Sequence, residues 1–170
     1  MDPMYSFAID PALPKAQLYG ELLQAAEALI GDETDALANL CNVAALVYYG
    51  LPAINWAGFY LRRGSELVLG PFQGQVACVR IPLGRGVCGT AAVRRETVVV
   101  PDVHAFPGHI ACDAASRSEI VVPLISDGDL VGVLDIDAPA PDRFDEQDRT
   151  GLERLADVLI RRIHWDGLLG

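Results

Sequence analysis

The chain has 170 residues and a mass of 18.3 kDa, which suits one domain with a sizeable core and is too short for two ordinary domains. Hydrophobic residues make up 51% and charged residues 21%, so the composition is that of a globular protein rather than a disordered or fibrous one. The formal net charge of -10, with Lys15 as the only lysine, leaves no positive field for nucleic acid or an anionic membrane, and we expect neither as a partner.

Residues 1–14 are expected to form an N-terminal arm, because Pro11 and Pro14 interrupt any early helix. This segment has no basic start and no apolar signal core. The longest apolar runs of the chain fall far short of the ~20 residues that a membrane span needs. We therefore expect a soluble, cytoplasmic protein.

Two helices are expected next. Apolar residues recur at helical spacing from Lys15 to Ile30, and Gly31 ends the pattern. A second helix begins near residues 32–34 and stops at Gly50. Its expected buried stripe, which makes Cys41 a small core residue, consists of Leu37, Leu40, Cys41, Ala44, Ala45 and Tyr48.

The middle of the chain is typical of strands. "INWAGFYLRR" and "SELVLGPF" are joined by the turn "RRGS", "VACVRIPL" is a third strand, and "GRGVCGTAAVRRE" predicts a short helix before the strand "TVVVPDV". After an irregular loop over residues 104–118, "EIVVPLI" and "LVGVLDIDA" flank "SDGD" as a hairpin. A last helix follows Asp145, its expected N-cap, with Asp148 three residues on. Hairpins outnumber crossovers, so we predict an α+β fold whose central, mostly antiparallel sheet has the helices on one side.

Two motifs have alternative explanations. Gly84 to Gly89 is a literal GxGxxG, but Pro82 lies in the supposed central strand and no second βαβ half follows, so a nucleotide site is disfavoured. His104, His109 and Cys112 could be zinc ligands, yet the closely spaced ligand pairs of structural zinc sites are absent from the sequence. We expect no metal and no cofactor, and we expect the two histidines to shape a pocket wall.

The cysteines are candidates for redox chemistry. Cys88 lies in the first turn of a predicted helix, where the helix dipole favours its thiolate. Cys112 lies in a loop of small residues that a small molecule could reach. Together with Cys78 they suggest one thiol that attacks and another that resolves the product as a disulfide. The alternative is that all three are inert structural cysteines.

In the strand that contains "GVLDIDAP" alternate residues share a face, which is expected to place Val131, Val133, Asp135 and Asp137 on one side. The two aspartates are then roughly 7 Å apart, and in a partly buried site such like charges need a cation between them. An α-ammonium group fits that need. The alternative is a solvated strand end.

Glu119 opens the paired strand, and the hairpin register decides whether it joins the two aspartates. A two-residue turn at Asp127 and Gly128 pairs Glu119 with Ile136, on the wrong face. A three-residue turn through Asp129, or a bulge at Pro123, pairs it with Asp137 instead. We predict that the turn is not the tight two-residue form, and that crowding of the acids raises the pKa of Glu119.

Several stretches resemble the free methionine-(R)-sulfoxide reductases, which are stand-alone GAF domains: "NWAGFY", "GPFQGQVACVRIPLGRGVCGTAA", "VPDVHAFPGHIACDAASRSEIVVP", "GVLDIDAP" and "RFDEQDRTGLERLA". The resemblance runs from about Tyr5 to Leu159. It implies that residues 1–170 form a single GAF domain with a closed pocket for free methionine sulfoxide. A homodimer through the N-terminal helices is compatible with it.

The resemblance also implies roles for individual residues. Cys112 is the nucleophile that becomes a sulfenic acid, Cys78 or Cys88 resolves it, and thioredoxin reduces the disulfide. Glu119 engages the sulfoxide oxygen. The substrate-binding residues are Asp135 and Asp137, which anchor the ammonium, and Trp56 and Tyr60, which face the methyl group. The rival interpretation is a GAF module that senses a nucleotide or small effector without chemistry, since "RFDEQD" is similar to nucleotide-binding members.

Overall fold

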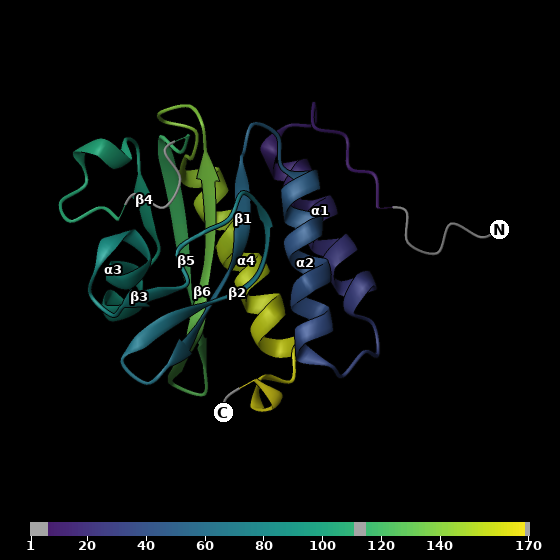
Figure 1. Ribbon diagram of the computed structural model, residues 1–170. Coiled ribbons are helices and arrows are strands. Elements are labelled where there is room, and N and C mark those ends of the chain that lie inside the picture. The colour runs from purple at the N-terminus through teal and green to yellow at the C-terminus, as the bar shows by residue number, and fades with distance from the viewer. Residues whose placement is uncertain (1–6, 111–114, 169–170) are drawn as a thin grey trace.

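The computed structural model describes residues 7–110 and 115–168 (Figure 1). Helices pack beside a sheet whose strands come from the middle of the chain. The elements are, in order, α1 (Lys15–Ile30), α2 (Ala36–Gly50), β1 (Trp56–Arg63), β2 (Glu66–Gly74), β3 (Arg80–Pro82), α3 (Gly86–Arg94), β4 (Val98–Val100), the 3-10 turn η1 (Val103–Ala105), β5 (Ser118–Ser126), β6 (Asp129–Ala138), α4 (Glu146–Arg162) and the 3-10 turn η2 (Trp165–Gly167).

The six strands form one sheet in the order β3-β2-β1-β6-β5-β4, and every neighbouring pair is antiparallel. The predicted α+β fold with a central antiparallel sheet is therefore confirmed. Helices α1, α2 and α4 lie together on one side of the sheet, whereas α3 lies on the other (Figure 1). The expectation that all helices share one side is wrong for α3, because its short apolar stripe packs against β5 and β6 from the opposite face.

Helix α2 ends at Gly50 as predicted but begins at Ala36, later than the expected 32–34, with Asp35 as the N-cap, and its buried stripe is shifted by one position. Leu40, Val43 and Val47 face the core, while Leu37 is 52% exposed. Cys41 is also exposed, so its expected burial is wrong. Apolar residues lie on nearly all sides of this helix, and the pattern alone did not decide which stripe faces inward.

Helix α4 begins with a capping box in which the Asp145 side chain accepts from the backbone N–H of Asp148 and the Asp148 side chain accepts from that of Asp145. This confirms the expected N-cap. Asp148 is only 1% exposed, and it also accepts hydrogen bonds from Tyr19 Oη at 2.7 Å and Lys15 Nζ at 2.6 Å, and from Arg143 Nη1 at 3.3 Å. The carboxylate therefore ties α1, the segment before α4 and α4 together.

Two hydrophobic clusters lie on the two faces of the sheet. The larger one joins α1, α2 and α4 to alternate residues of β1, β5 and β6, including Phe59, Leu134 and Ile136. The smaller one lies under α3 and contains Trp56 and Tyr60. The strand alternation thus sends one set of side chains to the three helices and the other set to α3.

The hairpin between β5 and β6 has a different turn from the one predicted, but it still pairs Glu119 with Asp137. Ser126 lies opposite Asp129, and Asp127 and Gly128 have φ of 50° and 82°, so the turn is the tight two-residue form. The prediction that the turn would not have this form is wrong. A register shift between Leu124 and Ile125 leaves Val131 as an extra residue. Beyond this bulge Glu119 lies opposite Asp137.

The bulge also moves Val131 to the face of the sheet toward α1, α2 and α4, where it packs with the larger cluster. Val133 lies on the opposite face, with the smaller cluster. The predicted common face is therefore wrong for Val131 and right for Val133, Asp135 and Asp137, which follow the bulge.

Among the described residues, none of the helices combines the length and the apolar character needed to span a membrane.

Candidate active site

The strand register gathers the expected acidic residues on the face of the sheet that α3 covers. Asp137 on β6 lies between Glu119 on β5 and Trp56 on β1, and these three residues form one row across the sheet. Asp135 occupies the next position on the same face, opposite Gly58. Three carboxyl groups therefore lie close together although they come from two strands.

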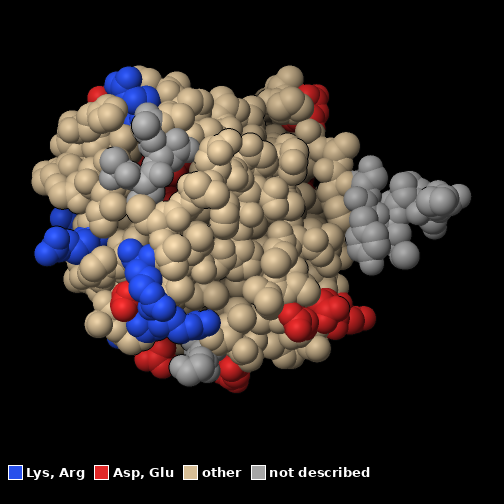
Figure 2. All heavy atoms as spheres, viewed as in Figure 1, with Lys and Arg blue, Asp and Glu red and all other residues tan. Residues whose placement is uncertain are grey.

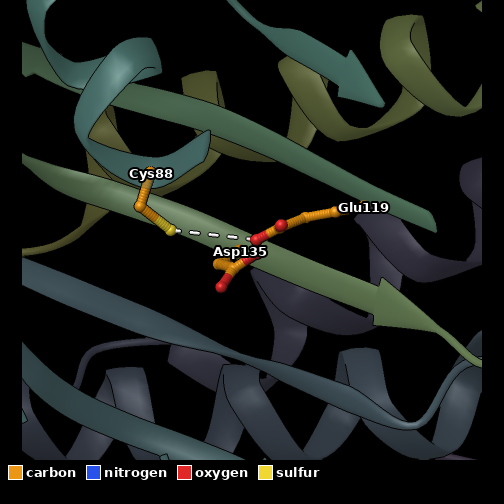
Figure 3. A group of neighbouring side chains, drawn as sticks. All are labelled: Cys88, Glu119 and Asp135. Carbon is orange, nitrogen blue, oxygen red and sulfur yellow. Dashed lines mark hydrogen bonds between the residues drawn. The ribbon is translucent and has the colours of Figure 1, made fainter. Parts of the chain in front are cut away.

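These carboxyl groups line a pocket whose other walls come from β1, α3 and the loops between strands. The N-terminal turn of α3 contributes Gly86, Val87 and Cys88. In Figure 3 the Cys88 side chain points from α3 toward Glu119 and Asp135, with its Sγ 4.0 Å from Oε2 of Glu119. In the space-filling view, acidic atoms are visible deep in a hollow of a face that is mostly uncharged (Figure 2).

Two aromatic side chains form the wall beside the acids. The Trp56 and Tyr60 rings are stacked with their centroids 6.0 Å apart, and Phe72 stacks on Trp56 at 5.3 Å. Trp56 Nε1 donates to the Gln75 carbonyl at 3.0 Å. Tyr60 Oη donates to the Cys78 carbonyl at 2.8 Å. These bonds fix the rings and hold the backbone of Cys78 at the pocket.

Burial dominates the electrostatics of this pocket. Glu119 is 7% exposed and Asp135 is 5% exposed. Loss of solvent raises the pKa of Glu119 well above its ordinary value, and the charges of Asp135 and Asp137 raise it further. Loss of solvent also raises the pKa of Asp135, and the neighbouring Glu119 and Cys88 side chains partly offset that rise. The expected upward shift for Glu119 thus has burial as its main cause, with repulsion second.

The cysteines differ from one another in state. Cys78 is disulfide-bonded, whereas Cys41 and Cys88 carry free thiols. Burial raises the pKa of Cys88 well above its ordinary value, and the charges of Asp135 and Glu119 add to the shift. The expectation that the helix dipole makes Cys88 a thiolate is therefore wrong, because loss of water and two facing carboxyls outweigh the dipole. Cys112 lies outside the described residues.

The two histidines that were expected near the pocket have different positions. His109 is half-buried and lines it, and burial lowers the pKa of its imidazole, with a smaller contribution from His104. His104 is exposed in η1. Among the described residues, the group that could hold a metal ion is a different one, consisting of Cys88, Glu119 and Asp135.

The glycines of the GxGxxG motif have packing roles. Gly84 and Gly86 have φ of 85° and 62°, which favours glycine at the turn into α3. A Cβ on Gly89 would lie 2.6 Å from the Pro82 carbonyl oxygen, so glycine there lets α3 approach β3 closely. These constraints account for the motif without a nucleotide.

Several pocket residues were not found from the sequence: Val76, Ala77, Ile81, Arg85, Val87, Ile110 and Ser116. Most are small or apolar and come from loops or strand ends, which gives them no distinctive pattern. The arrangement as a whole offers an acidic wall, a flat aromatic wall and the thiol of Cys88. It suits a small cationic or zwitterionic ligand with an apolar end.

The comparisons with known proteins agree on one family. The sequence pattern of the GAF domain matches residues 20–163. The free methionine-R-sulfoxide reductase of Escherichia coli (strain K12) is 55% identical over 141 residues, covering 83% of this chain and 86% of that protein. The enzyme of the same name from Saccharomyces cerevisiae is 47% identical over 155 residues, covering 86% of each chain.

The solved structures show the same likeness in three dimensions. The X-ray structure of free methionine-R-sulfoxide reductase from Neisseria meningitidis, in complex with its substrate, matches with a TM-score of 0.89 at 51% identity. The match covers 93% of this chain and 95% of that one. The resemblance seen in the sequence is thus confirmed, and the chain belongs to the free methionine-(R)-sulfoxide reductases of the GAF domain family.

Proposed function

We propose that the protein reduces the (R)-sulfoxide of free methionine to methionine. The observation that carries this proposal is the row of Glu119, Asp137 and Trp56, with Asp135 beside it, on one buried face of the sheet. The paired carboxylates of Asp135 and Asp137 can bind the α-ammonium of a free amino acid, and the stacked rings of Trp56 and Tyr60 can contact the S-methyl end of methionine sulfoxide. A peptide-bound residue has no such ammonium, which gives the preference for free substrate a physical basis.

The chemistry proposed for this site starts with Cys112 as the nucleophile, as the resemblance implies. Its thiolate attacks the sulfoxide sulfur while Glu119 protonates the sulfoxide oxygen. The oxygen then moves from the substrate sulfur to the Cys112 sulfur as the transient bond between the two sulfurs breaks, so methionine leaves and Cys112 becomes a sulfenic acid. The raised pKa of Glu119 supports this role, since the carboxyl holds its proton at a higher pH than an exposed glutamate does.

For the second step we propose Cys78 as the resolving thiol. It attacks the sulfenic sulfur, water leaves and a disulfide forms. The disulfide-bonded state of Cys78 supports this choice over Cys88, whose buried free thiol has a raised pKa. A dithiol reductant, for which we propose thioredoxin in the cytoplasm, then restores both thiols. The proposed cycle requires no metal or organic cofactor.

The direct test supplies both epimers of free methionine sulfoxide together with thioredoxin and its reductase. We expect the R form to be consumed in multiple turnovers and the S form to remain. No consumption of the R form would sink the proposal. The rival sensing function predicts instead that a ligand is bound and recovered unchanged, even after every cysteine is blocked.

Single cysteine-to-serine variants distinguish the nucleophile from the resolving cysteine. Cys112→Ser is expected to abolish turnover. Cys78→Ser should permit about one reduction per subunit before stalling, because the sulfenic acid then has no resolving partner. Cys88→Ser should continue through many turnovers. If Cys88→Ser stalls and Cys78→Ser does not, the two roles are reversed.

A further inference from the structure

Three potential metal ligands from separate elements meet in the pocket (Figure 3). They are the Sγ of Cys88 on α3 and one carboxylate oxygen each from Glu119 on β5 and Asp135 on β6, and all lie within 4.8 Å of one another. The Cys88 Sγ to Glu119 Oε2 distance is 4.0 Å. Convergence from three elements makes the grouping a product of tertiary structure rather than of sequence neighbours.

The grouping contains an unsatisfied acceptor. Oδ1 of Asp135 is buried and receives no hydrogen bond within the part of the chain that the structure describes. The Asp135 side chain lines the pocket and is 5% exposed, so bulk water does not replace the missing partner freely. A buried acceptor of this kind keeps an uncompensated desolvation cost unless a donor or a cation reaches it. It therefore points to an occupant that carries positive charge.

The donor set selects a class of cation. One thiolate with two carboxylates suits zinc, for which ligand bonds are about 2.3 Å to sulfur and about 2.0–2.2 Å to oxygen. Ligands at tetrahedral angles around such an ion are about 3.5 Å apart, so the observed separations require shifts of about 1 Å or less in side chains. Calcium and magnesium are hard cations that take oxygen ligands, so the Cys88 sulfur disfavours both.

We propose that Zn²⁺ binds in this pocket to the Cys88 sulfur and to one oxygen each of Glu119 and Asp135, with water as the fourth ligand. The thiol proton is released to solvent when the metal binds. Three protein ligands and one open position make a reversible site rather than a closed structural one. Nothing in the proposed reductase activity requires this ion.

The proposal has a consequence for activity that rests on the proposed function. Zn²⁺ would neutralise Asp135, one of the two aspartates expected to receive the substrate ammonium, together with Glu119, and it would fill the space in front of them. Zn²⁺ should therefore act as a competitive inhibitor, raising the KM for methionine sulfoxide and leaving kcat unchanged.

Metal binding is measured without substrate, so that its outcome is independent of the reductase activity. The full chain carries Cys41→Ser, which removes an exposed thiol, and is prepared without reductant so that Cys78 stays in its disulfide. Zn²⁺ affinity is measured by competition with a chromophoric chelator. Cd²⁺ serves as a probe whose thiolate-to-metal ultraviolet band reports a bond to sulfur.

We expect one equivalent of Zn²⁺ and a thiolate band with Cd²⁺. Cys88→Ser in the same background should abolish the band and weaken Zn²⁺ binding at least about 100-fold, beyond the usual effect of removing an outer-shell partner. Asp135→Asn keeps the thiol and should weaken binding at least about tenfold. His104→Ala, on the exposed η1 turn, is the matched control and should bind as the parent does.

Circular dichroism melts establish that each variant is folded. Parent-like Zn²⁺ affinity in either folded Cys88→Ser or folded Asp135→Asn would overturn the proposal, as would loss of binding in His104→Ala alone. A protein that binds Zn²⁺ as expected but reduces no methionine sulfoxide retains the metal site and loses only the proposed function.

Discussion

The two faces of the sheet differ in what they bury. The face toward α1, α2 and α4 buries apolar residues such as Leu134 and Ile136, which alternate along β6 with Asp135 and Asp137. The face toward α3 buries carboxyl groups and a free thiol. One strand therefore contributes to a conventional core on one side and to a charged pocket on the other. Close packing on the first face supplies the stability that a pocket of like charges does not.

The largest effect is expected from a change on the pocket face. Glu119→Gln keeps the size of the side chain and removes its proton donor, and we expect kcat to fall by about 10²- to 10⁴-fold. The midpoint of thermal unfolding should not fall, because one of three crowded carboxyl groups has been removed. Steady-state kinetics and a thermal melt on the same sample measure both effects.

The matched control for this change is Glu153→Gln, an exposed position on α4 beyond the other face. It should leave kcat and the melt unchanged. Wild-type kcat in Glu119→Gln would contradict the role proposed for Glu119.

On the side of the sheet that α1, α2 and α4 cover, the largest loss of stability is expected from Asp148→Ala. This change leaves Arg143, whose side chain is 10% exposed, without its carboxylate, and it removes the acceptor of the Tyr19 hydroxyl. Breaking a buried ion pair by removing one partner costs about 3–5 kcal/mol. The free energy of unfolding from urea titration measures it.

Glu146→Ala is the control on the same helix. Its carboxylate is 84% exposed and pairs with Arg149 at 3.4 Å, so the loss should be at most about 1 kcal/mol. Equal losses in the two variants would show that the buried network around Asp148 adds nothing beyond a surface pair.

A smaller loss is expected where α1 packs on α4. A Cβ on Gly151 would lie 2.2 Å from the Tyr19 ring, so Gly151→Ala forces the two helices apart and should cost about 1–3 kcal/mol. Gly20 lies inside α1 with no atom within 4 Å of the added Cβ. Gly20→Ala should therefore stabilise the protein by about 0.5–1 kcal/mol.

Urea midpoints of the two alanine variants provide the comparison. The same substitution is expected to act in opposite directions in two helices that contact each other. A stabilised Gly151→Ala would mean that α1 and α4 are not packed as closely as the structure indicates.

The smallest effect is a pH dependence at the start of α4. Lys15 lowers the pKa of Asp145 from its ordinary 3.8 to about 2, chiefly through a hydrogen bond to the carboxylate. Because the folded-state pKa is depressed, this contribution to stability is present above about pH 4 and is lost as the pH falls toward 2. The Asp145 side chain is 54% exposed, so the contribution is small.

Asp145→Asn retains a capping oxygen and lacks the titrating carboxyl. Its stability deficit relative to wild type should therefore shrink between pH 4 and pH 2, as measured by urea midpoints at both values. Asp157→Asn, exposed on the same helix, is the control and should show no such convergence. A deficit for Asp145→Asn that stays constant over this range would contradict the assignment to Lys15.

Much of the fold could be predicted from local patterns. The order of helices and strands, the Gly64 turn between β1 and β2, and the Asp145 cap are all encoded by neighbouring residues. The stripe of α2 was misjudged at Leu37 and Cys41, because a helix that is apolar on several sides does not reveal which side its neighbours will cover.

The site was predictable only in part. The alternation of Asp135 and Asp137 is a property of one strand, and the sequence indicated it. Their alignment with Glu119 depends on the bulge at Val131, and no single residue of the sequence predicts that bulge. The thiol of Cys88 was misjudged because the helix dipole is a local feature, whereas the carboxyls that face it come from β5 and β6.

By itself the sequence determined the family, the order of the elements and the candidate acids and cysteines, because each of these depends on residues that are neighbours along the chain. Only the tertiary structure decided that three carboxyl groups share one face, that Cys88 is a buried thiol opposite them, and that Cys41 is on the surface. Strand register, burial and the charges that one residue meets are set by packing between distant segments, and they determine the chemistry available to each side chain.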